Sequence, residues 1–378
     1  MAHQSTSLGS NTKRSIGHDL NKAFLNDHEY EEYENYKKTK TDTNTAQTDE
    51  SQIISSARSI EHYTQILVSR GFQSYFFDPT QHTFRRVSDT IRDRSYFETV
   101  YVNGYVIALT TFSMIAAGTV ESYNVSTNKW VTVDSLPRKL RSIAAVAVGT
   151  KIYVLGGIDL DTLEKSNSIY ETEVLNDGTL SGWTLSPITL LSRRYRHSAC
   201  ITADNKIYIA GGIISNSNDK EDSFTSSVEI FDPVANTVTS GPPMKINRAI
   251  DTSLLTIDSD LYAIGGDIAM PTFDSTGSSP NGSIEKLNNM TKKWEIVTHF
   301  PIPRHGISVA HIGQVIYVYG GHTLTGLDDN YDPDVSTWDA YDLSTGIWLS
   351  SKRGNKDRLV PFDSFCGSAC VVPGAPTG

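Results

Sequence analysis

The sequence predicts an all-β fold made of repeated units, each with four short antiparallel strands. Four segments of the 378-residue chain share one pattern, in which a short apolar stretch with a central tyrosine ends in two glycines. The pattern recurs about every 55 residues, and a fixed period of this length is typical of units stacked in a row or arranged around an axis. The four segments are Lys151–Gly157, Lys206–Gly212, Asp260–Gly266 and Val315–Gly321.

One complete unit shows the expected elements in order. Small and apolar residues at Arg196–Ile201 predict the first strand, and Lys206–Ala210 predicts the second. Ser227–Asp232 and Thr237–Thr239 predict the third and fourth strands, separated by a tight turn. Asn, Asp, Pro, Ser and Gly supply the backbone angles of such turns. The glycine pair predicts a close approach between the backbone of one unit and its neighbour.

The fourth strand of each unit allows the units to be counted. This strand carries a tryptophan or another apolar residue, at Phe84, Trp130, Trp183, Val238, Trp294 and Trp348, so six units are predicted. Two units depart from the glycine pattern: Thr110-Thr111 and Ser69-Arg70 take the place of the glycines.

The unit around residues 63–87 lacks a first strand on its N-terminal side. Ser368–Val371 repeats the Ser-Ala-Cys-apolar pattern of Ser198–Ile201. We therefore expect the C-terminal strand to complete the first unit, an arrangement that leaves no unpaired sheet edge at the junction.

The glycine pairs, the downstream tyrosines and the closing tryptophans resemble the kelch family of β-propellers. The resemblance covers almost all of residues 59–378 and implies a six-bladed kelch-type β-propeller with four-stranded antiparallel blades. Residues 1–58 are rich in Ser, Thr, Asn, Lys and Glu, which predicts a disordered N-terminal tail. This tail is too short for the BTB and BACK domains that accompany many kelch repeats, so we expect a stand-alone kelch protein.

Composition limits the possible partners. The formal net charge of −10 disfavours nucleic-acid binding, which needs clustered lysines and arginines. No apolar run is long enough to cross a membrane, and no secretory signal precedes the repeats. Three cysteines, an odd number, argue against a disulfide framework. We expect a cytoplasmic protein without a membrane association, and the sequence does not predict its oligomeric state.

Arginines recur where the first strand of a unit begins. Because rotation relates the blades of a propeller, equivalent residues would form a ring at one mouth of the central channel. Like charges this close repel one another unless carboxylates and carbonyls, or an anionic ligand, offset them. The predicted ring consists of Arg94, Arg141, Arg196, Arg248 and Arg304.

The resemblance implies an acidic peptide of a partner protein as the ligand, since kelch proteins of this kind use such arginines to bind peptide carboxylates. Two histidines that follow their arginines, His197 and His305, are either further binding residues or part of the packing between blades. Two carboxylates on first strands, Glu98 and Asp251, could instead neutralise Arg94 and Arg248, which would weaken the anion site.

We predict a protein-interaction module that uses the channel mouth and the polar loops after the glycine pairs. The alternative is a sugar-modifying enzyme of the sialic acid epimerase type, with the arginines on the sugar carboxylate and Glu98 or Asp251 moving protons. No metal motif, phosphate loop or nucleophile elbow is present, so no cofactor is expected. The acidic residues between Asp328 and Asp334 are read as solvated.

Overall fold

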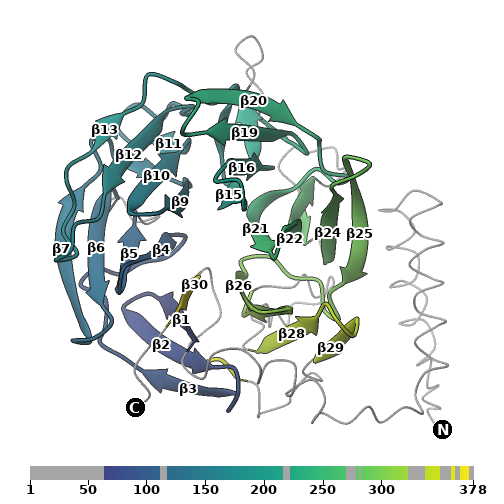
Figure 1. Cartoon of the computed structure of the whole chain (residues 1–378), viewed down its shortest axis with the longest axis horizontal. Helices are drawn as coiled ribbons and strands as arrows, with labels where there is room; N and C mark the ends of the chain where they lie inside the picture. The colour runs from purple at the N-terminus through teal and green to yellow at the C-terminus, as the bar shows by residue number, and fades with distance from the viewer. Residues whose placement is uncertain are drawn as a thin grey trace, which may run out of the picture.

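The computed structural model describes residues 64–110, 117–215, 222–269, 278–280, 282–321, 337–349, 359–361 and 367–373. Every regular element in these ranges is a β-strand. Six antiparallel sheets of four or more strands surround a central axis like the blades of a propeller (Figure 1). The predicted all-β kelch-type propeller is therefore confirmed.

Each sheet is a meander whose strands run outward from the axis in chain order, apart from the first sheet. From the innermost strand outward, three of the sheets are β30 (Ser368–Val372), β1 (Gln65–Arg70), β2 (Gln73–Asp78) and β3 (Thr83–Arg86); β4 (Glu98–Val102), β5 (Tyr105–Leu109), β6 (Thr119–Asn124) and β7 (Lys129–Ser135); and β9 (Ala144–Val148), β10 (Lys151–Leu155), β12 (Ile169–Glu173) and β13 (Thr184–Leu185).

The other three sheets follow the same plan. They are β15 (Ser198–Ile201), β16 (Ile207–Ala210), β19 (Val228–Asp232) and β20 (Thr237–Gly241); β21 (Ala249–Ile257), β22 (Asp260–Ala269), β24 (Ser283–Asn288) and β25 (Lys293–His299), with β23 (Ser278–Pro280) beside β22; and β26 (Ser308–Ile312), β27 (Val315–Tyr319), β28 (Trp338–Asp342) and β29 (Ile347–Leu349).

Short strands add two small sheets near the starts of two blades. In one, β8 (Leu140–Arg141) pairs with β11 (Ile158–Asp159). In the other, β14 (Arg193–Tyr195), β17 (Ile213–Ser215) and β18 (Asp222–Phe224) lie side by side.

The glycine pairs follow the second strand in three blades, whereas β22 continues through Gly265 and Gly266 to Ala269. Gly157 has a φ of +96°, and a Cβ atom built on it would lie 2.7 Å from Cγ2 of Ile143. Where Thr110 replaces the first glycine, it adopts the same left-handed region, with a φ of 57°. A Cβ atom on Gly156, the first glycine of this pair, would lie 2.5 Å from the carbonyl oxygen of Arg194 in the next blade, whereas Gly157 contacts the chain that enters its own blade. The close approach to a neighbouring blade that the sequence predicted is therefore present at Gly156.

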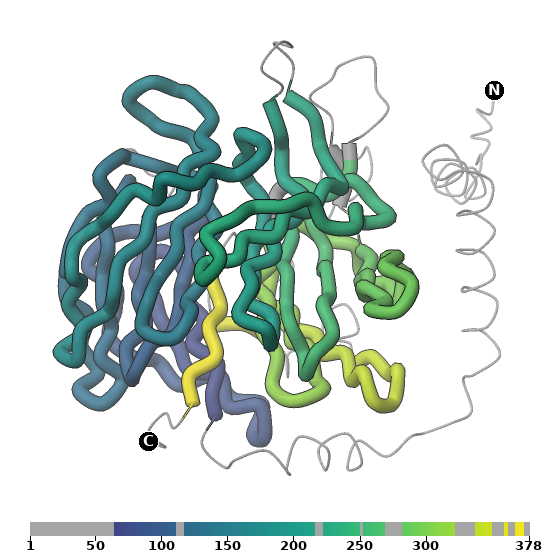
Figure 2. The backbone as a smooth tube through the Cα atoms, turned by 45° about the horizontal axis from the view of Figure 1, so that its top comes forward, coloured from purple at the N-terminus to yellow at the C-terminus, as the bar shows by residue number. Residues whose placement is uncertain are grey.

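The chain ends meet in one blade. β30 pairs antiparallel with β1, with Ser368 opposite Ser69 and Cys370 opposite Leu67 (Figure 2). The innermost strands contact one another in the cyclic order β4, β9, β15, β21, β26 and β30, and β30 contacts β4 again. β30, the last strand in the chain, is therefore the innermost strand of the first blade.

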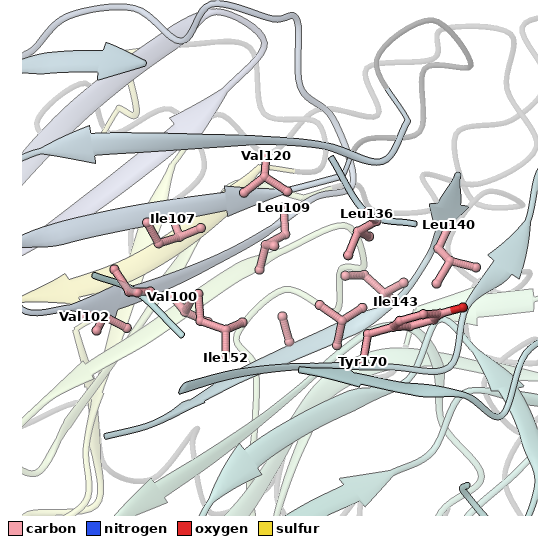
Figure 3. Packing of buried hydrophobic residues seen from close by; sticks show 13 residues of the cluster. Val100, Val102, Ile107, Leu109, Val120, Leu136, Leu140, Ile143, Ile152 and Tyr170 are labelled. Carbon is pink, nitrogen blue, oxygen red and sulfur yellow. The ribbon is translucent and has the colours of Figure 1, made fainter. Parts of the chain in front are cut away.

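Apolar side chains fill the spaces between neighbouring blades rather than one common centre. One such cluster joins Ile107 and Leu109 of β5 to Ile152 and Val154 of β10 (Figure 3). Five further clusters occupy the other boundaries among the described residues. Each fully buried Val, Leu or Ile side chain contributes about 1.5–3 kcal/mol, so the boundaries between blades account for most of the apolar stabilisation.

Several sequence-based predictions fall on other parts of the chain. The predicted tail, residues 1–58, lies outside the described residues, as do the acidic loop from Asp328 to Asp334 and the side chain of Asp251. The boundary of the propeller at residue 59 stays a prediction. Across the described ranges, no helix is long and apolar enough to cross a membrane.

Candidate functional site

The mouth of the central channel contains a cavity to which all six blades contribute. Its volume is about 120 Å³, and its walls come from the residues at and just before each innermost strand. One position, opposite the residue that precedes the glycine pair, recurs in every blade. It is occupied by Glu98, Ala144, Ser198, Ser253, Ser308 and Ser368. Because Ser368 is opposite Ser69, Arg70-Gly71 occupies the glycine position of the first blade, and the prediction of Ser69-Arg70 was wrong by one residue.

Two serine hydroxyls of this ring form hydrogen bonds to a neighbouring blade. Oγ of Ser198 accepts a hydrogen bond from the backbone N of Leu254 at 2.9 Å. Oγ of Ser368 lies 2.8 Å from Oγ1 of Thr99 on the next blade. The cavity wall is therefore polar but rigid, since its hydroxyls also tie neighbouring blades together.

A second recurring position lies two residues before this ring and has left-handed backbone. It is occupied by Tyr96, Ser142, Arg196 and Gly306, with φ angles of 51°, 53°, 52° and 66°. Glycine is the residue that adopts this conformation without cost, whereas a residue with a Cβ atom is strained there. The side chains of Tyr96, Ser142 and Arg196 line the cavity, and the backbone N of Arg196 donates to the carbonyl of Ser142 at 2.9 Å.

Three of the five predicted arginines are buried and already paired. Nη2 of Arg94 lies 3.1 Å from Oε1 of Glu121, and Nη2 of Arg248 lies 2.7 Å from Oε1 of Glu285. Arg304 pairs in the same way with Asp339. In each blade, the arginine precedes the first strand and its partner lies on the third strand. Carboxylates and carbonyls, not a ligand, therefore offset these three charges.

The partner carboxylates also hold the chain that enters each blade. Glu121 accepts a hydrogen bond from the backbone N of Ile91, and Glu285 accepts one from the backbone N of Lys245. The guanidiniums donate to backbone carbonyls at the end of the second strand, Thr110 for Arg94 and Gly265 for Arg248. We call this arrangement the arginine–carboxylate pair.

The expected equivalence of the five arginines does not hold. Arg194, which the sequence analysis missed, is the true counterpart of Arg94 and Arg248: it is buried and lies 2.6 Å from Glu229. Arg196 lies two residues further on, at the left-handed position. Arg141 lies in β8 at the position of Tyr195 in β14, because each is opposite the first residue after a glycine pair.

The suggested neutralising carboxylates also differ from those found. Glu121 and Glu285 on the third strands pair with Arg94 and Arg248, whereas Glu98 lines the central cavity. Burial lowers the pKa of each paired guanidinium, and the adjacent carboxylate acts in the opposite direction. An arginine remains charged in any case, so each pair is ionic.

The two histidines have different surroundings. His197 is buried against Gly156 of the preceding blade and Gly212 of its own, and burial lowers its pKa to about 3. It is therefore a neutral packing residue at physiological pH. Nδ1 of His305 lies 2.9 Å from Oδ1 of Asp267, and its side chain is 25% exposed. Of the two, His305 is the more accessible to a ligand.

Arg196 is half-buried beside the cavity, and among the described residues its guanidinium forms no hydrogen bond or ion pair. Tyr195, the residue before it, donates its hydroxyl proton to Asp222 at 3.1 Å, and burial raises the pKa of that hydroxyl to about 12. Within the described ranges, no three His, Cys, Asp or Glu side chains come close enough together to hold a metal ion.

Repeated four-stranded blades around a polar channel define a β-propeller. A model of the kelch motif matches residues 193–245, which span β14 to β20. The chain therefore contains a kelch motif, and the kelch resemblance that the sequence analysis described is confirmed in this blade.

Similar curated proteins carry related names. Kelch-like protein 23 of Homo sapiens is 24% identical over 214 residues, which cover 56% of this chain and 35% of that protein. Kelch-like protein 26 of Danio rerio is 25% identical over 62% of this chain and 36% of its own length. Kelch-like protein terF of Aspergillus terreus is 23% identical over 66% of this chain and 52% of its own length. The chain thus spans between about a third and a half of these relatives.

Proposed function

We propose that this protein is a protein-interaction module and that its partner presents an acidic side chain to Arg196 at the channel mouth. The kelch-like relatives support the general class of interaction module. The acidic partner is proposed from the site itself.

The observation that carries this proposal is the state of Arg196. Four other arginines at the starts of blades are buried in carboxylate pairs, but Arg196 is half-buried, lines the cavity and retains its donors. Its left-handed backbone costs about 1–3 kcal/mol where glycine would cost nothing, as at Gly306. Such strain is typical of a residue retained for its side chain. Guanidinium groups bind carboxylates through two parallel hydrogen bonds, which suits an Asp or Glu of a partner.

The surroundings support a single acidic side chain rather than a whole small molecule. The cavity of about 120 Å³ is well below the 300–1,000 Å³ of typical ligand pockets. The ring of serines offers hydroxyl donors to a carboxylate. Arg141 lies at the neighbouring position of another blade and would extend the cationic surface. The buried Arg94, Arg248 and Arg304 hold the blades and do not face a partner in this proposal.

Binding is tested with fluorescent peptides that contain Asp and Glu, compared with peptides in which Asn and Gln replace them. We expect the acidic peptides to bind and Arg196→Ala to weaken them by about 2 kcal/mol, as expected for a charge-assisted contact. Arg86→Ala is the matched control, since Arg86 is an exposed arginine paired with Asp89 on the outer strand of another blade. Equal binding by wild type and Arg196→Ala would refute the role of Arg196.

The epimerase alternative rests on the presence of Glu98 and Arg196 in the same cavity. It is tested by following the anomer ratio of N-acetylneuraminic acid by NMR with the wild type and Glu98→Gln. Acceleration that depends on Glu98, without binding to any acidic peptide, would replace the interaction module by the enzyme.

A further inference from the structure

Four of the six blades contain the arginine–carboxylate pair. In the blade of β30, β1, β2 and β3, Tyr75 opposite Val68 occupies the carboxylate position, and the arginine position lies outside the described residues. In the blade of β9, β10, β12 and β13, Leu140 occupies the arginine position and Tyr170 the carboxylate position. The register shows this: Tyr170 is opposite Val154, as Glu229 is opposite Ile209 in the next blade. Likewise, Leu140 in β8 directly precedes Arg141 as Arg194 in β14 directly precedes Tyr195. An ionic pair is thus replaced by an apolar one, which belongs to the cluster in Figure 3.

Ser168 keeps its place in this blade although its usual partner is missing. In two other blades the serine two residues before the carboxylate, Ser227 or Ser283, accepts a hydrogen bond from the arginine. In the described part of the chain, the hydroxyl groups of Ser168 and Tyr170 form no hydrogen bond or ion pair. Tyr170 is only 7% exposed, so a polar atom of a buried side chain is left available.

A cavity of about 310 Å³ lies at this place. Leu140, Ser168, Tyr170 and Leu185 form part of its wall, and Leu185 is 55% exposed. We call it the outer cavity, to distinguish it from the cavity at the channel mouth, with which it shares no residue. Its volume falls in the range of small-molecule sites, and its wall combines apolar surface with hydroxyl donors.

The charged residues of the outer cavity favour an anion. Three cations and two carboxylates line it, namely Arg138, Lys165, Arg193, Asp159 and Glu164. Asp159 is occupied, since it pairs with Arg138 at 3.3 Å and accepts hydrogen bonds from the backbone of the turn that follows it.

Arg193 has the weakest carboxylate pairing of the three cations. Its Nη1 lies 3.9 Å from Oε2 of Glu164 and donates to the carbonyl of Lys165 at 3.1 Å, and the side chains of Arg193 and Glu164 are 53% and 72% exposed. An exposed ion pair at that distance contributes little, so an anion can displace Glu164. Lys165, in contrast, is paired with Asp222 at 3.2 Å.

We propose that the outer cavity binds a small organic acid, a carboxylate or phosphate group carried on an apolar body. Arg193 would bind the anionic group, the Tyr170 and Ser168 hydroxyls would donate to it, and Leu140 and Leu185 would contact the apolar body. This site is independent of the proposed function at the channel mouth.

The first test measures the binding of two probes, benzoate and phenyl phosphate, to the full chain by saturation-transfer NMR. Benzyl alcohol is the neutral comparison. We expect at least one anion to bind with a dissociation constant in the millimolar range and benzyl alcohol to bind more weakly. The anion that binds more tightly shows whether the site prefers a carboxylate or a phosphate group. Failure of both anions to bind in that range would overturn the proposal.

Four substitutions then locate the site. Tyr170→Phe should weaken binding about 3- to 10-fold by removing one hydrogen bond, and Arg193→Gln should weaken it about 10-fold. Glu164→Gln should tighten binding about 2- to 5-fold, because the competing carboxylate is lost. That gain would not follow from a purely structural role. Arg86→Gln serves as the matched surface control and should leave binding unchanged.

The outer cavity can also be filled with the side-chain pair that other blades carry at this place. The double variant Leu140→Arg and Tyr170→Glu installs the pair that four other blades contain. We expect it to fold, as judged by thermal unfolding, and to lose binding of the anion. A folded double variant with unchanged affinity for the anion would contradict the assignment. If the double variant does not fold, the single variants decide: Tyr170→Phe should weaken anion binding and Glu164→Gln should tighten it.

Discussion

The guanidinium of Arg248 and the carboxylate of Glu285 meet at 2.7 Å between Nη2 and Oε1, and neither side chain is exposed to solvent. Nε of Arg248 also donates to Glu285 at 3.0 Å, while Nη1 donates to the carbonyls of Gly265 and Ser283. Glu285 in turn accepts from the backbone N of Lys245. One ion pair therefore joins the entering chain, the end of the second strand and the third strand of a blade.

Breaking this pair should destabilise the protein strongly. Arg248→Leu leaves Glu285 buried without its cation, and removal of one partner of a buried pair costs about 3–5 kcal/mol. Glu285→Tyr should cost a similar amount. The two changes together reproduce the Leu140 and Tyr170 arrangement of another blade, so we expect the double variant to recover much of the loss. Urea unfolding of the four proteins measures the coupling.

The control for this cycle is Arg86→Leu. Arg86 and Asp89 form an exposed pair at 2.9 Å, so its loss should change the free energy of unfolding by less than about 1 kcal/mol. A double variant whose loss equals the sum of the two single losses would mean that the pair is not the unit of stability.

The sequence predicted the fold because the glycine pairs leave little freedom. Each pair combines left-handed backbone with contacts that exclude a Cβ atom, as at Gly157 and Gly212, so four of the six blades keep the pattern. The missing first strand could also be located, because Ser368–Val371 copies Ser198–Ile201 and both are innermost strands.

The arginines were harder to place because two candidates stand close together. The paired arginines precede the first residue of the glycine position by 16 or 17 residues, as shown for Arg94, Arg194 and Arg248. Arg141 and Arg196 precede it by only 15. Aligning on this spacing, rather than on the small residues of the first strand, would have selected Arg194. The carboxylate partners lie on another strand, and no local pattern links them to their arginines.

Two glycines with nearly equal φ angles allow backbone strain and steric exclusion to be separated. Gly157 has a φ of +96° and Gly182 a φ of +98°, but a Cβ atom on Gly182 would meet nothing within 4 Å. Gly182→Ala should cost about 1–3 kcal/mol from strain alone. Gly157→Ala should cost at least about 1 kcal/mol more, because the new methyl group would meet Ile143 and the carbonyl of Arg141. Equal losses in urea unfolding would show that space is not limiting at the glycine pair.

His197 should make the stability of the protein depend on pH. Burial lowers the pKa of this imidazole to about 3, whereas the unfolded chain binds a proton near pH 6.5. The contribution of the neutral imidazole to the free energy of unfolding is therefore complete above about pH 6.5. It is lost as the pH falls toward 3, by up to about 1.4 kcal/mol per pH unit.

The matched variant is His197→Ile, because Ile143 and Ile307 occupy the same place against the glycine pairs of other blades. Between pH 7 and pH 5, the wild type should lose about 2 kcal/mol more than His197→Ile. Measuring both proteins at both pH values cancels the titration of other groups. Parallel losses would mean that the imidazole becomes protonated in the folded state.

Cys370 reports on the junction between the chain ends, because it lies on β30 opposite Leu67 of β1. Burial raises the pKa of its thiol to about 12, so very little thiolate is present at pH 8. In a variant with Cys200→Ser and Cys366→Ser, Cys370 is the remaining thiol, and its alkylation should be about a thousandfold or more slower than in urea-unfolded protein.

Leu67→Ala should accelerate alkylation by loosening β30, because Leu67 and Cys370 share one apolar cluster. Leu261→Ala, a buried substitution in a cluster on another blade boundary, controls for general destabilisation. Equal acceleration by the two alanine variants, after correction for their free energies of unfolding, would mean that β30 opens only when the whole propeller unfolds.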